Sequence, residues 1–153
     1  MAKIIDIIKD LYPYNYSVAG EDNDKSIKIF NKYLKFKIHN FKSEKILNGW
    51  KIPKAEKIIR ADIFYKKKKI LDGLNSPFHI ISQSINFTGE VKGKDLLKRL
   101  YVSKECPNGI PYNWTGLYRP DQKTWGFCVK KNFLKKIDKY KTYFVNIKIK
   151  KQN

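Results

Sequence analysis

The chain has 153 residues, of which 42% are hydrophobic and 14% aromatic, enough for a folded domain and too many for a disordered chain. It contains no apolar run near the roughly 18 residues of a membrane-spanning helix. Asp6, Lys9 and Asp10 interrupt the first apolar residues, which does not fit a signal peptide. Two cysteines are too few for a disulfide framework, so we expect a cytoplasmic protein.

The net charge of +19 is made almost entirely by lysine. Three of the 33 basic residues are arginines, which leaves 33 − 3 = 30 lysines spread over nearly every segment. Arginine is the side chain suited to bidentate contacts with phosphates and bases. A scattered lysine excess is typical of an AT-rich genome, and we expect neither a specific nucleic-acid partner nor a membrane partner. Non-specific association with nucleic acid, weakening steeply with salt, is the remaining alternative.

The first third of the chain predicts two short helices. Residues 3–12 place apolar side chains at helical spacing until Pro13, which ends the pattern. Residues 23–34 repeat that spacing with Ile27, Phe30 and Leu34 on one face. Acidic side chains precede or begin this second helix, where the helix dipole favours negative charge: Glu21, Asp22 and Asp24.

The pattern then changes to that of strands separated by turns. Residues 36–40 alternate apolar and polar side chains, and the lysine run 66–69 predicts a charged hairpin tip. The other predicted extended segments are 46–52, 58–65, 78–87, 124–129 and 140–149. Short helical insertions are predicted at 93–100 and 132–137. The expected fold class is α+β: two short N-terminal helices followed by a mainly antiparallel, sandwich-like or barrel-like β domain with small helical insertions.

The residue types that carry out catalysis or bind metals are scarce and dispersed. His39, His79, Cys106 and Cys128 lie far apart without paired-ligand spacing, so we expect no metal site in this chain. Cys128 follows Trp125-Gly126-Phe127 in a predicted core strand, where a free cysteine behaves as a small hydrophobic residue. Cys106 lies in a turn without an obvious activating neighbour. We therefore expect no catalytic residue.

The segment 110–128 combines aromatic residues with glycine and proline more densely than any other. We expect Trp125 and Phe127 to lie in the core, because large aromatic side chains dominate cores. Trp114 and Tyr118 lie in a loop, where a ligand-binding and a structural role are both open. The candidate ligand-binding residues are therefore Trp114, Tyr118 and Tyr112.

Several motifs, in this order, resemble one group of bacterial proteins. They are Leu11-Tyr12-Pro13, Ser17-Val18-Ala19-Gly20-Glu21, Trp50-Lys51-Ile52-Pro53, Phe78-His79-Ile80-Ile81, Ile110-Pro111-Tyr112 and Trp125-Gly126-Phe127-Cys128. The group is that of the DUF4910/DUF2172-type aminopeptidase-like proteins, which are often labelled as polysaccharide-biosynthesis proteins. The resemblance runs over nearly the whole chain. Three departures concern loops and not the fold: Tyr16 in place of a frequent Arg, Asp22 in place of a frequent Gly, and a longer segment 113–124.

The resemblance implies a division of labour between this chain and a peptidase-like domain. Longer family members resemble zinc exopeptidases of the M28 kind, with a β-rich domain inserted near the front. Residues 1–34 would form the edge of the peptidase-like domain and residues 35–153 the β-rich insert. The family's metal ligands lie downstream of Asn153, so zinc is expected only there and no catalytic residue is carried over.

Two hypotheses about function follow. In the first, the chain is the non-catalytic N-terminal portion of an aminopeptidase-like protein, truncated or split from a peptidase-like domain and inactive alone. In the second, it is a stand-alone β-rich binding module for a glycan, peptide or protein partner. Sequence alone leaves its status as an enzyme open.

Overall fold

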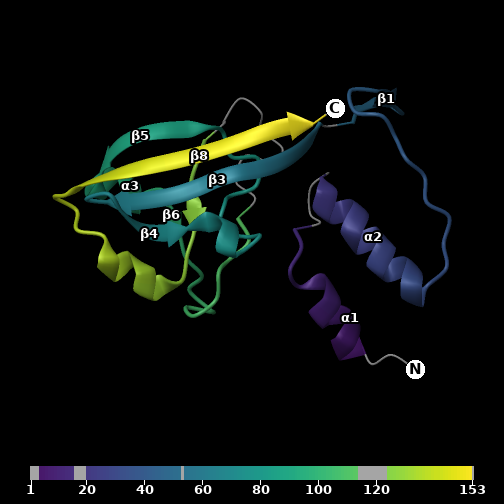
Figure 1. Ribbon diagram of the computed structural model, residues 1–153, viewed down its shortest axis with the longest axis horizontal. Coiled ribbons are helices and arrows are strands. Elements are labelled where there is room, and N and C mark those ends of the chain that lie inside the picture. Colours follow the sequence, from purple (N-terminus) through teal and green to yellow (C-terminus); the bar gives the residue numbers. More distant parts are fainter. Residues whose placement is uncertain (1–3, 16–19, 53, 114–123, 153) are drawn as a thin grey trace. The chain divides into compact units, whose positions relative to one another are not determined.

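A computed structural model of the chain describes residues 4–15, 20–52, 54–113 and 124–152 (Figure 1). These residues form two units, Met1–Lys57 with Lys150–Asn153 and Ile58–Ile149. Each unit is described by itself below. The predicted division at residue 34, which concerns the family's domain layout, stays a prediction.

The first unit contains both predicted helices, α1 (Ile4–Leu11) and α2 (Glu21–Tyr33). The Tyr33 hydroxyl donates a hydrogen bond to Asp10 Oδ2 at 3.1 Å and so joins the two helices. Helix α2 begins two residues earlier than predicted, because Gly20 is extended at its N-terminus and Glu21, Asp22 and Asp24 all lie in the first turn.

Between the helices and the main sheet, the prediction for 36–40 is wrong. These residues form no strand, although their side chains alternate. A strand requires a partner for its backbone groups, and the described residues provide none for this segment. Residues 46–52 form a small hairpin of β1 (Ile46–Leu47) and β2 (Trp50–Lys51), with Asn48 and Gly49 at positive φ in its turn.

The second unit is built on a four-stranded sheet in the order β4-β3-β8-β5. Its strands are β3 (Ala55–Tyr65), β4 (Lys68–Asp72), β5 (Phe87–Lys92) and β8 (Thr142–Gln152). β3 with β4 and β5 with β8 pair antiparallel, which agrees with the mainly antiparallel domain that was predicted. β5 begins at Phe87, where the predicted extended segment 78–87 ends. Helices combined with mostly antiparallel strands confirm the predicted α+β class. The described strands do not close into a barrel.

Shorter elements pack against this sheet. They are η1 (Gly73–Asn75), α3 (Gly93–Leu97), β6 (Leu100–Tyr101), β7 (Phe127–Cys128) and η3 (Lys131–Lys136). β6 and β7 pair parallel, which the sequence did not predict. Residues 78–86 are mostly turns with a single bridge between Ile80 and Phe127, because much of their backbone hydrogen-bonds to irregular segments instead of a strand.

One hydrophobic core unites the sheet with these elements. β8 points Tyr143, Val145 and Ile147 inward on alternate residues, and all three are buried. The buried members of the core are Ala61, Ile63, Ile80, Leu96, Leu100, Trp125, Phe127, Val129, Phe133, Ile137, Tyr143, Val145 and Ile147.

Gly93 is the point where α3 meets the turn before β8. Its N–H donates to Lys141 O at 2.8 Å, and an added Cβ would collide with Asp138 O. We therefore expect Gly93→Ala to lower the free energy of unfolding by about 1–3 kcal/mol, the usual range for overpacking. Urea denaturation measures this change.

Gly89→Ala is the matched control, because its Cβ would meet Phe87 at an ordinary 3.7 Å. The control should retain the stability of the natural chain. Equal losses for the two variants would contradict the predicted clash at Gly93.

Candidate functional site

Of the three predicted ligand-binding residues, the structure describes Tyr112. Its side chain is 42% exposed, and its ring meets Phe78 edge-on with centroids 6.3 Å apart. Trp114 and Tyr118 lie outside the described residues. The ligand-binding role of all three stays a prediction.

Trp125 and Phe127 lie in the core, as predicted. Trp125 is 7% exposed and stacks on Phe87, with ring centroids 4.3 Å apart. The Arg99 guanidinium lies 5.2 Å from the centre of the Trp125 ring and donates hydrogen bonds to Trp125 O and to the Thr124 hydroxyl. This arrangement orders the backbone on one side of the 114–123 segment.

His79 and Cys128 come together through the His79 ring and backbone groups of both residues. His79 Nδ1 is 2.7 Å from the Cys128 carbonyl oxygen. Because a carbonyl oxygen can only accept, Nδ1 carries the hydrogen and donates the hydrogen bond. The Cys128 N–H donates in return to His79 O at 2.8 Å. These two hydrogen bonds therefore join the segment around His79 to β7.

The Cys128 thiol is unsuited to nucleophilic catalysis. Burial raises its pKa from 9.0 to about 11, and the opposing hydrogen bond from the Asn113 backbone is the weaker influence. The thiol is thus protonated at neutral pH, while the thiolate is the reactive form. The structural role predicted for Cys128 agrees with this chemistry.

The described residues do not fit a metal centre. Among them, no three or more His, Cys, Asp or Glu side chains lie close enough together to hold an ion. His39 belongs to the first unit, and His79 and Cys128 to the second. A structural or catalytic zinc needs at least three converging protein ligands, and this part of the chain does not bring three together.

The first unit exposes many large apolar side chains, and the hypothesis of a chain split from a peptidase-like domain expects such a surface. On α1, Ile4, Ile5, Ile8 and Tyr12 just beyond it are all exposed, with Ile4 at 76%. Others are exposed along residues 34–50, and we call the whole set the apolar surface: Ile4, Ile5, Ile8, Tyr12, Leu34, Phe36, Ile38, Phe41, Ile46, Leu47 and Trp50.

Comparison with known proteins identifies the family. The profile of DUF2172, described as a domain of unknown function, matches residues 50–150, which is more than half of the chain. The chain belongs to the DUF2172 family. Its DUF2172 region contains the entire second unit, while both helices lie before it.

Two relatives of this DUF2172 protein come from Clostridium acetobutylicum. One, named by inference as a polysaccharide biosynthesis protein with an aminopeptidase-like domain, is 27% identical over 131 residues, covering 85% of this chain. The other, a crystal structure of a protein named by inference as a peptidase, is 24% identical with a TM-score of 0.78 over 96% of this chain, which shows the shared fold. The DUF2172 protein spans 29% of the first relative and 34% of the second.

None of the helices in the described part of the chain is long and apolar enough to cross a membrane. This finding agrees with the absence of long apolar runs in the sequence.

The two thiols should differ sharply in reactivity. Cys106 is exposed and Cys128 is buried with a raised pKa, so Ellman's reagent at pH 8 should modify only Cys106 in the folded DUF2172 protein. Absorbance should report one thiol in the folded state and two in denaturant. Rapid modification of both thiols in the folded state would contradict the burial of Cys128.

Proposed function

We propose that this chain is the N-terminal, non-catalytic portion of an aminopeptidase-like protein related to the M28 zinc exopeptidases, of the DUF4910 type. In this proposal it acts in the cytoplasm, in polysaccharide biosynthesis, together with a peptidase-like domain. The names of the two relatives support it, as does the fact that the chain spans only about a third of their length.

The observation that carries the proposal is the apolar surface of the first unit. Large exposed groups of apolar side chains are rare on soluble monomers and mark interaction sites. On α1, Ile4, Ile5 and Ile8 recur at helical spacing and stay exposed after α1 and α2 have packed. A peptidase-like domain, in the same chain or in another, would bury them.

The catalytic zinc belongs to the peptidase-like domain in this proposal. The described residues offer no cluster of metal ligands, and Cys128, the buried thiol, is protonated. The role of this chain is then to complete and position the catalytic domain. Alone, it should not hydrolyse aminoacyl-p-nitroanilides, with or without added zinc.

Binding to the missing domain tests the proposal. The remaining two thirds of the Clostridium acetobutylicum relative can be coexpressed with this chain, and light scattering after size exclusion measures the complex. We expect a 1:1 complex that Ile4→Gln/Ile8→Gln weakens at least about a hundredfold, because a buried isoleucine contributes roughly 1.5–3 kcal/mol.

Lys9→Gln on the same helix is the control, since Lys9 is also exposed but polar. It should leave the complex intact. Helix content by circular dichroism should be equal in all three proteins. A complex equally stable with the isoleucine variant would refute docking through α1.

A second candidate function is a stand-alone binding module for a glycan or protein. The half-exposed ring of Tyr112, beside the Gly/Pro-containing segment that includes Trp114 and Tyr118, favours this alternative. Tryptophan fluorescence that responds to a glycan in the natural chain, but not in Trp114→Ala or Tyr112→Ala, would support it. An unchanged spectrum across a glycan panel would count against it.

A further inference from the structure

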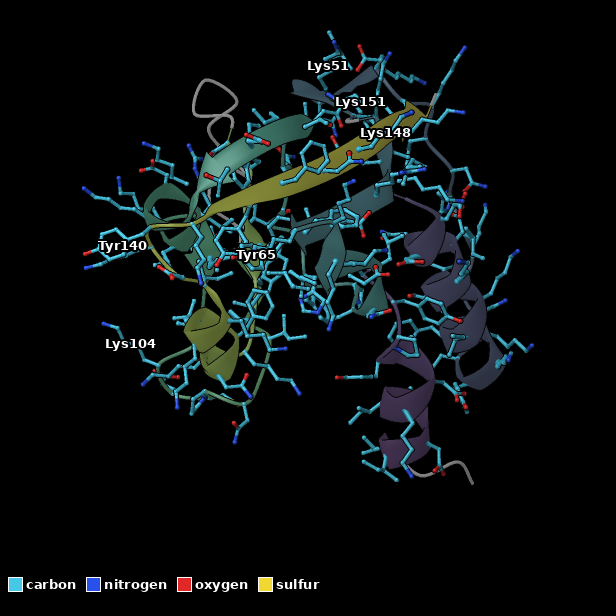
Figure 2. All side chains as sticks on the ribbon, turned by 60° about the vertical axis from the view of Figure 1, so that its left-hand side comes forward. Lys51, Tyr65, Lys104, Tyr140, Lys148 and Lys151 are labelled. Atoms are coloured by element: carbon cyan, nitrogen blue, oxygen red, sulfur yellow. The ribbon has the colours of Figure 1, made fainter. Side chains whose placement is uncertain are left out.

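Two turns at one end of the main sheet bring together lysines that lie more than seventy positions apart in sequence. The β3–β4 turn carries Lys66 and Lys67, and the turn before β8 carries Lys139, Tyr140 and Lys141. We call these five residues the basic end. Figure 1 shows the tip of the β3–β4 hairpin and the start of β8 at the same end of the sheet, and Figure 2 shows Tyr65 and Tyr140 there.

Tyr65 joins the two turns through its ring. Lys66 Nζ lies 5.7 Å from the ring centre, and Lys141 Nζ, from the other turn, lies 5.6 Å from it. The ring also packs on Tyr143, with centroids 5.2 Å apart. Cation–π attraction thus holds ammonium groups from both turns near one aromatic pair, of which Tyr65 is partly buried and Tyr143 fully buried.

Most of the charge at this end lacks a counterion. Within the described part of the chain, Lys66, Lys67 and Lys139 form no salt bridge, while Lys141 pairs with Asp138 at 3.2 Å. Asp138 is the single acidic residue between Lys130 and Lys141, a stretch with six lysines. Such a concentration of like charge attracts anions and repels cations.

The backbone of the β3–β4 turn indicates that its lysines are not there for stability. Lys66 and Lys67 have φ of 46° and 64°, the left-handed region in which a side chain is strained. Asn-Gly is the favoured pair for such a two-residue turn. Lysine at both positions costs stability and places two positive charges at the most protruding point of the hairpin.

Tyr140 adds an exposed aromatic surface to this charge. Its side chain is 83% exposed, and Lys139 Nζ lies 4.8 Å from its ring centre. A flat ring beside an ammonium group can pack on the apolar face of a sugar while the charge pairs with a carboxylate.

We propose that the basic end binds an acidic polysaccharide, with Lys66, Lys67 and Lys139 pairing its carboxylates and Tyr140 stacking on a sugar ring. A nucleic-acid interface would favour arginine, which these two turns lack. An anionic membrane would favour several inserted apolar side chains, whereas the described turns expose a single ring. The choice of a polysaccharide rests on the proposed function; the site itself rests on the second unit alone.

Polygalacturonate oligosaccharide, an anionic sugar polymer, is the probe, and calorimetry at low ionic strength measures its Kd with the full chain. Lys66→Asn/Lys67→Gly should raise Kd about tenfold, equivalent to about 1.4 kcal/mol. The same variant should raise the urea denaturation midpoint, because it relieves the turn. Weaker binding by a more stable protein cannot result from unfolding.

Lys148→Gln/Lys150→Gln removes the same charge from the other end of β8 and is the matched control. Lys148 lies seven residues from Lys141, about 23 Å along an extended strand, and Figure 2 shows it well away from Tyr140. The control should leave Kd unchanged, and Tyr140→Ala should weaken binding. An equal loss in the control, or no loss in Tyr140→Ala, would overturn the proposed site.

Duplex DNA and phosphatidylserine vesicles test the other classes of anion. Tighter binding of either one than of polygalacturonate, at equal ionic strength, would overturn the choice of a polysaccharide. No binding of polygalacturonate would overturn the proposal outright. Neither result would affect docking through the apolar surface, which is measured with a different partner and different variants.

Discussion

The structure depends most on the position of β8 between β3 and β5. A strand flanked on both sides has its backbone groups satisfied along its length, and its inward side chains can then form the floor of a core. Tyr143, Val145 and Ile147 are that floor, and Trp125, Phe127 and Phe133 cover it from segments with little regular structure of their own. The short β6–β7 pair and the turns at 78–86 contribute Leu100, Phe127 and Ile80 to the same core.

The two surfaces of the chain suit partners of opposite chemistry. Burial of the apolar surface of the first unit lowers the free energy of a complex, and this burial requires a large, complementary and apolar partner. The basic end of the second unit is hydrated and charged, and it suits a flexible anion that keeps part of its water. Taken together, the two proposals assign a catalytic domain to one unit and an anionic polymer to the other.

Sequence patterns were sufficient where structure is local. Helix α1, the long strands β3 and β8, and the tight turn at Lys66 follow from periodicity and from residues adjacent in sequence. The patterns failed where the partner is distant. Residues 36–40 alternate like a strand without having a neighbour, and the parallel β6–β7 pair depends on an encounter between Leu100 and Phe127 that no local pattern encodes. The basic end was missed for the same reason: residues 66–69 were interpreted alone as a hairpin tip and residues 140–149 as a strand, and no local pattern brings the two together.

Three hydrogen bonds fix the backbone of the turn that carries Tyr140. The backbone N–H of Gly93 and Lys94 bond Lys141 O and Lys139 O at 2.8 and 3.0 Å, and the Asp138 N–H donates to the Tyr143 hydroxyl at 2.8 Å. Folding has therefore already removed most of the conformational freedom of this turn. A ligand arriving there would order little backbone, so even a few weak contacts could give measurable affinity, with the entropic cost of association largely that of the ligand itself.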